Sequence, residues 1–96
     1  MHEIRQLPEF SDRLKNLRDQ RARAKIMVRV ERVSDGNFGD SRSVGGDVSE
    51  MRITEGPGYR VYYTRRGECV VILLCGGNKS TQQNDIKRAR NLATNI

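Results

Sequence analysis

The sequence predicts an α+β fold, and the spacing of apolar residues is the main reason. These residues recur every three or four positions before residue 34 and again after residue 80, as in amphipathic helices. Between residues 48 and 75 they alternate or run continuously, which indicates strands joined by turns. We expect the order β-α-α-β-β-β-α with an antiparallel sheet, in one domain over residues 1–96.

The first segment is expected to form a short strand and two helices. Residues 3–7 alternate polar and apolar side chains, and Pro8 both ends that strand and suits a first helical turn. Each following segment marks one helical face, with Phe10, Leu14 and Leu17 in the first and Ala22, Ile26, Val30 and Val33 in the second. We expect helices over 8–18 and 20–34, packed as a hairpin. One long, kinked helix is the alternative.

The middle of the chain is expected to form a three-stranded meander. Residues 35–47 are rich in Gly, Asp, Asn and Ser, which is the composition of a loop. Strands are expected over 48–54, 59–65 and 69–75, joined by turns at 55–58 and 66–67. The last strand is almost wholly apolar, so it should be central. Alternation assigns the core side to Tyr59, Val61 and Tyr63, with Met51 and Ile53 from the partner strand.

A final helix is expected after the apolar strand, which residues 76–79 end. Ser80 and Gln83 have the spacing of a capping box. The apolar face of this helix would consist of Ile86, Ala89, Ala93 and Ile96.

The charge balance favours a polyanionic partner. The chain has 18 Lys and Arg against 12 Asp and Glu, a formal net charge of +6. Nucleic acid is the first candidate and an acidic protein the second, while plain solvated charges are equally compatible. The basic residues of the two helices are expected mainly to be solvated, although they could also hold RNA phosphates: Arg18, Arg21, Arg23, Lys25, Arg29 and Arg32.

Several classes of protein find no support. The two cysteines, Cys69 and Cys75, would lie about 20 Å apart on one face of a straight strand, so we expect buried free thiols and no disulfide. His2 is the single histidine and no Cys-x-x-Cys occurs, so neither a metal site nor a cofactor is expected. No segment has the apolar length of a signal peptide or a membrane span, so a cytoplasmic protein is expected.

A cationic rim at one end of the sheet is the candidate site. Arg52 and Arg60 are expected on the wetter face, where two guanidinium groups can bind one phosphate, although solvated arginines would look the same. Gly76 and Gly77 would let the backbone approach a ligand, and Lys79 adds a charge beside a helix N-terminus. The segment is not a P-loop.

Few carboxylates are expected near this rim: Glu50 on its strand and Asp85 in the last helix. Asp85 could orient Lys79 or Arg60 or accept a proton, or it could simply favour the first turn of the helix. No Ser/His/Asp set can be assembled, because His2 lies at the extreme N-terminus.

Three blocks of the sequence resemble the addiction-module killer proteins of the RelE/HigB-like toxin superfamily, from bacterial type II toxin–antitoxin systems. The blocks are VSEMRI at 48–53, GPGYRVYY at 56–63 and LLCGGNKSTQQNDI at 73–86. Residues 8–10 and 36–40 also fit, so the likeness covers nearly the whole chain.

The resemblance implies a RelE-like fold and ribosome-dependent cleavage of mRNA, in which a 2′-hydroxyl attacks the adjacent phosphate. It implies catalytic roles for Arg60, Lys79 and Asp85. Asp85 stands about where some relatives carry a proton-transferring Tyr or His, which leaves the proton route open. Substrate-binding positions would be Arg52, Tyr62, Asn78 and Ser80.

The resemblance also implies partners: a helix-turn-helix antitoxin, mRNA on the ribosome, and operator DNA through the antitoxin complex. Two other functions remain open. One is a non-enzymatic inhibitor of the ParE type that acts on DNA gyrase, and the other is a catalytically silent nucleic-acid-binding module.

Overall fold

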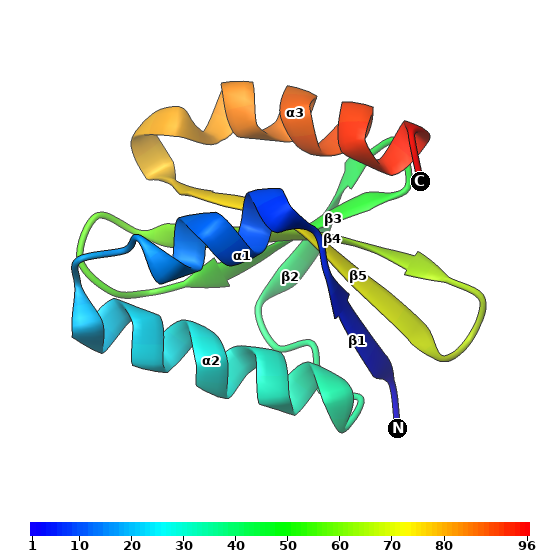
Figure 1. The fold of residues 1–96 in the computed structure, drawn as a ribbon, viewed down its shortest axis with the longest axis horizontal. Helices are drawn as coiled ribbons and strands as arrows, with labels where there is room; N and C mark the ends of the chain where they lie inside the picture. The colour runs from blue at the N-terminus through cyan, green and yellow to red at the C-terminus, as the bar shows by residue number, and fades with distance from the viewer.

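The computed structural model describes residues 1–96 and contains five strands, three α-helices and one short 3-10 helix (Figure 1). The elements in order are β1 (Glu3–Gln6), α1 (Pro8–Lys15), α2 (Gln20–Ser34), β2 (Ser41–Gly45), β3 (Val48–Ile53), β4 (Tyr59–Arg66), β5 (Val70–Asn78), η1 (Lys79–Thr81) and α3 (Gln82–Thr94). This arrangement confirms the predicted α+β class.

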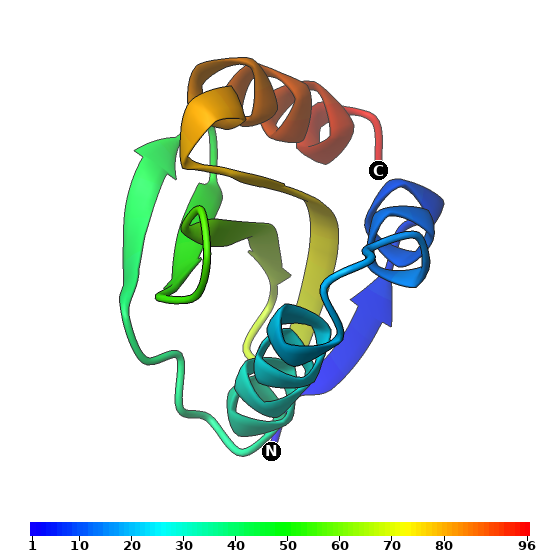
Figure 2. The same cartoon turned by 90° about the vertical axis from the view of Figure 1, so that its left-hand side faces the viewer.

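All five strands belong to one sheet in the order β1-β5-β4-β3-β2. β2, β3, β4 and β5 pair antiparallel in that order, whereas the N-terminal strand β1 lies parallel beside β5. The apolar strand β5 is therefore interior, as predicted. Figure 2 shows α3 on one side of the twisted sheet and α1 and α2 on the other.

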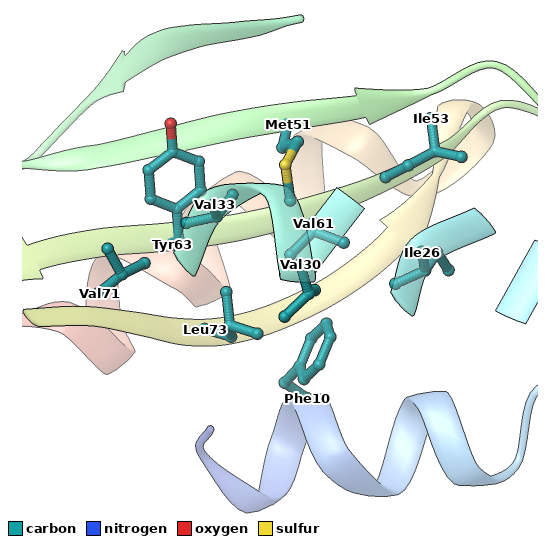
Figure 3. Packing of buried hydrophobic residues seen from close by; sticks show 10 residues of the cluster. All are labelled: Phe10, Ile26, Val30, Val33, Met51, Ile53, Val61, Tyr63, Val71 and Leu73. Atoms are coloured by element: carbon teal, nitrogen blue, oxygen red, sulfur yellow. The ribbon is translucent and has the colours of Figure 1, made fainter. Parts of the chain in front are cut away.

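The core has two parts, one on each face of the sheet. The face towards α1 and α2 buries Met51, Ile53, Val61 and Tyr63 against Phe10 and the apolar stripe of α2, as Figure 3 shows. The opposite face packs Val48, Tyr62, Ile72, Leu74 and Cys75 against Ala89 and Ala93 of α3. Strand alternation therefore assigned the first set correctly, but the second face is also buried.

α1 and α2 are separate helices, which excludes the single kinked helix. Asp19 provides the break, because its Oδ1 accepts a hydrogen bond of 3.0 Å from the Ala22 backbone N–H and so caps α2. The predicted helical hairpin is only partly present: α1 and α2 follow each other on one face of the sheet, but α1 packs mainly on β5 while α2 packs on β3.

The predicted loop over 35–47 contains an additional strand, β2. It pairs with β3 through the two-residue turn Gly46–Asp47, and both turn residues have positive φ, of 60°. Such a turn matches the twist of a hairpin. The loop prediction was wrong because the Gly- and Ser-rich composition hid this turn between two short strands.

A bulge in β5 changes which side chains face α3. Tyr62 pairs with Cys75 but Tyr63 pairs with Leu73, so Leu74 is the extra residue. Leu74 and Cys75 consequently join the same core. Both cysteines are free as predicted, but Cys69 is exposed because it lies in the turn before β5 rather than in the strand.

The end of β5 also differs from the prediction. The strand continues through both glycines to Asn78, whose Oδ1 accepts hydrogen bonds from the Ser80 backbone N–H (2.9 Å) and hydroxyl (2.6 Å). Asn78 is therefore the capping residue, in a box with Thr81, and the predicted Ser80 cap was wrong. None of the helices is long and apolar enough to cross a membrane.

Candidate phosphate-binding site

Two rows of paired residues run across the sheet on the face that packs against α3. The first row consists of Arg42, Glu50, Tyr62 and Cys75, from β2 to β5. The second consists of Arg52, Arg60 and Gly77. Because paired residues project to the same face, the sheet brings Arg60 beside Gly77 and one step away from Glu50.

Glu50 is the centre of the first row and is completely buried. Its Oε2 accepts hydrogen bonds from the Tyr62 hydroxyl at 3.0 Å and from the Gln82 amide at 2.8 Å. Its Oε1 accepts one from Arg42 Nε at 3.1 Å and lies 3.6 Å from Arg60 Nη1. Desolvation by burial opposes ionisation, but the hydrogen bonds and Arg60 outweigh it, so the pKa of Glu50 is lowered. Burial and the adjacent Glu50 charge raise the pKa of Tyr62.

Arg60 is only 9% exposed, so the expectation of a wetter face was wrong at this position. The physical reason is that α3 covers the sheet there, and the first residue of α3 reaches Glu50. Arg60 Nε is a buried donor with no hydrogen-bond partner. Buried donors in folded proteins nearly always bond to protein or to ordered water, and Arg23 Nε and His2 Nδ1 share this state.

A shallow groove of about 260 Å³ leads to Arg60 from the surface. Arg52 lines the groove, is exposed and forms an ion pair of 3.3 Å with Asp40. Gly58 also lines it, and Lys79 lies alongside, with its Cβ 3.7 Å from where a Cβ on Gly58 would be. Lys79 is exposed and pairs with no carboxylate. The structure thus gathers three predicted cations along one groove.

The two glycines serve packing within the protein. A Cβ on Gly77 would lie 1.7 Å from Asp85 Oδ2, and one on Gly76 would lie 3.1 Å from the Arg60 carbonyl oxygen. Asp85 is half-buried over Gly77 and accepts a hydrogen bond from the Thr81 hydroxyl. The expected approach of a ligand to these glycines was therefore wrong, because a carboxylate of the protein occupies that position.

The remaining predicted binding residues are engaged locally. Tyr62 is buried and donates to Glu50, while Asn78 and Ser80 bond to each other. No group of three or more His, Cys, Asp or Glu side chains gathers where a metal ion could be held.

Comparison with known proteins identifies the family. The family described as "Phage derived protein Gp49-like (DUF891)" matches residues 12–95 of the chain. The chain belongs to the Gp49-like family. This is a family of toxin–antitoxin toxins related to RelE-type toxins. An uncharacterized protein of Haemophilus influenzae is 51% identical over 87 residues, which cover 91% of this chain and 88% of the relative. No solved structure matches the chain.

The basic residues of α2 in this Gp49-like protein are mainly exposed, as expected, but several also bond to the rest of the protein. Arg21 and Lys25 form ion pairs with Glu55, at 3.1 and 2.7 Å. Arg29 donates to the carbonyl oxygens of Arg52 and Phe38, and partial burial lowers its pKa. These charges thus tie α2 to the sheet and to the turn after β3.

Sequence analysis of the Gp49-like chain placed Glu50 near the rim, on the same side of β3 as Arg52. It did not show that Glu50 is buried against Arg60, or that Arg42 and Gln82 donate hydrogen bonds to Glu50. A lone glutamate in a strand assigned to a wet face gives no reason to expect burial, and only the position of α3 supplies it.

Proposed function

We propose that this Gp49-like protein is a toxin that stops translation by cleaving mRNA, acting on the ribosome, with the groove at Arg60 as its phosphate site. The gathering of Arg52, Arg60 and Lys79 along one groove carries this proposal. A phosphate of the substrate would accept hydrogen bonds from these side chains, and a guanidinium group suits a phosphate because its donors form a planar fork.

The proposed reaction needs few groups from the protein. The 2′-hydroxyl oxygen bonds to the adjacent phosphorus and gives its proton to a base. The bond to the 5′-oxygen breaks and that oxygen takes a proton from water, giving a 2′,3′-cyclic phosphate and a 5′-hydroxyl. Arg60, Arg52 and Lys79 would stabilise the negative charge of the pentacoordinate phosphorane, and such electrostatic stabilisation is usually a large part of catalysis. Asp85, over Gly77 in the row of Arg60, is the proposed proton acceptor.

The other predicted positions have supporting roles in this proposal. Tyr62 acts through Glu50, which lies against Arg60. Asn78 and Ser80 fix the 3-10 turn that carries Lys79. The proposal needs neither a metal nor a cofactor.

Arg60→Ala and Lys79→Ala test the site, with Lys15→Ala, an exposed lysine at the end of α1, as the matched control. Growth after induction without an antitoxin is measured, together with the 5′ ends of cellular mRNA. We expect the two site variants to permit growth while remaining folded, and the control to stay toxic with new mRNA ends. Full toxicity of both site variants would show that the site is misplaced.

The same experiment separates the alternative functions. Intact transcripts with DNA damage would indicate action on DNA gyrase, and harmless expression of the wild-type chain would indicate a silent binding module. The family implies an antitoxin partner, and we propose a helix-turn-helix protein encoded by the adjacent gene. Co-expression of that protein should restore growth.

A further inference from the structure

Glu50 is an unusual residue for the interior of a protein of this size. Its side chain has no exposed surface, and it contacts donors from three elements, which are β2, β4 and α3. Burying a carboxylate is costly, and well-packed apolar residues often stabilise a fold as well as a buried ion pair does. Stability alone therefore does not account for a charge at this position.

The two oxygens of Glu50 have different surroundings. Oε2 is held by Tyr62 Oη at 3.0 Å and by Gln82 Nε2 at 2.8 Å, which fixes the orientation of the carboxylate. Oε1 lies between Arg42 Nε at 3.1 Å and Arg60 Nη1 at 3.6 Å. The separation of 3.6 Å is longer than a direct hydrogen bond, so Glu50 attracts the guanidinium of Arg60 without occupying its donors.

We propose that Glu50 is a positioning residue, which holds Arg60 in the orientation that receives a phosphate. This inference rests on the proposed function and adds residues to the same site. Arginine has many rotamers, and fixing one before the substrate arrives removes an entropic cost from the reaction. Tyr62 and Gln82 act one step further away, because they orient Glu50.

Glu50→Gln tests this role, since it keeps the shape of the side chain and removes its charge. Thr64→Val is the matched control. Thr64 is also buried on β4, and its hydroxyl donates to the Asp47 carbonyl oxygen at 2.7 Å, without contact to Glu50. Both variants should unfold at somewhat lower urea concentration than the wild type.

Two measurements distinguish positioning from a structural role. We expect Glu50→Gln to lower the rate of ribosome-dependent mRNA cleavage by about 10–100-fold, because a small misplacement of a catalytic group has an effect of this size. In 15N-labelled protein, hydrogen exchange at Arg60 Nε should become at least about tenfold faster, because opening of the side chain is no longer opposed by the charge. Thr64→Val should change neither quantity.

An unchanged cleavage rate, or unchanged exchange at Arg60 Nε, in Glu50→Gln would overturn the inference. If Glu50→Gln does not fold, Gln82→Ala takes its place, because it removes one donor to Oε2 and should move both quantities in the same direction. If the wild type inhibits growth without cleaving mRNA, the proposed function fails. Growth inhibition and the exchange rate of the same variants then still decide whether Glu50 positions Arg60.

Discussion

Replacing Gly77 by alanine is expected to destabilise the fold by about 2–3 kcal/mol. Gly77 is a buried residue of β5, and the added Cβ would lie 1.7 Å from Asp85 Oδ2 and 2.8 Å from the Thr81 hydroxyl oxygen. Neither distance is possible between non-bonded atoms. Asp85 must therefore turn away, and its hydrogen bond from Thr81 is lost.

The magnitude follows from two overlapping costs and one smaller offset. Forced repacking costs about 1–3 kcal/mol, and losing a hydrogen bond to a charged group costs about 1.5–3 kcal/mol. These costs overlap, since moving Asp85 relieves the clash. Alanine also restricts the unfolded chain, which offsets about 0.4–1 kcal/mol. In a domain of this size, the net loss corresponds to a melting temperature lower by about 10–20 °C.

Urea denaturation of four proteins measures the effect: the wild type, Gly77→Ala, Asp85→Ala and the double variant. In the double variant the clash with Asp85 is absent and only the contact with Thr81 remains, so adding Asp85→Ala should partly restore the stability of Gly77→Ala. A Gly77→Ala protein as stable as the wild type, or no restoration in the double variant, would refute this reasoning.

Four further outcomes are expected. Tyr62→Phe should lower the free energy of unfolding by about 1.5–3 kcal/mol in urea titrations, because it removes a buried donor to a charged acceptor. The pKa of Glu50 is lowered in the folded state, so ionised Glu50 stabilises the fold above pH 4.5, its ordinary pKa. This stabilisation disappears as the pH falls through the folded-state pKa, and Glu50→Gln should therefore flatten the pH dependence of the free energy of unfolding in that range. Burial raises the pKa of Cys75 to about 11, so a thiol reagent at pH 8 should label the exposed Cys69 quickly and Cys75 only after denaturation. Arg29→Ala should lower the melting temperature and leave the pattern of mRNA cleavage unchanged, because Arg29 bonds only to carbonyl oxygens of the protein.

Local patterns predicted most of the elements and one complete face of the sheet. The alternation in β3 and β4 assigned Met51, Ile53, Val61 and Tyr63 to the core because adjacent residues of a strand point to opposite faces. β2 was missed because its turn resembles loop composition. The bulge at Leu74 could not be predicted either, because one extra residue in a wholly apolar strand leaves the sequence pattern unchanged.

The sequence predicted which residues form the candidate site, but not how deeply they are buried or which side chains they contact. The sequence by itself determined that Arg52, Arg60 and Lys79 are cations at the end of a sheet, since residue type and strand alternation are local properties. Only the tertiary structure decided that Arg60 is buried and lies against Glu50. The reason is that the path of α3 over the sheet depends on long-range packing of Ala89 and Ala93, which no local period specifies.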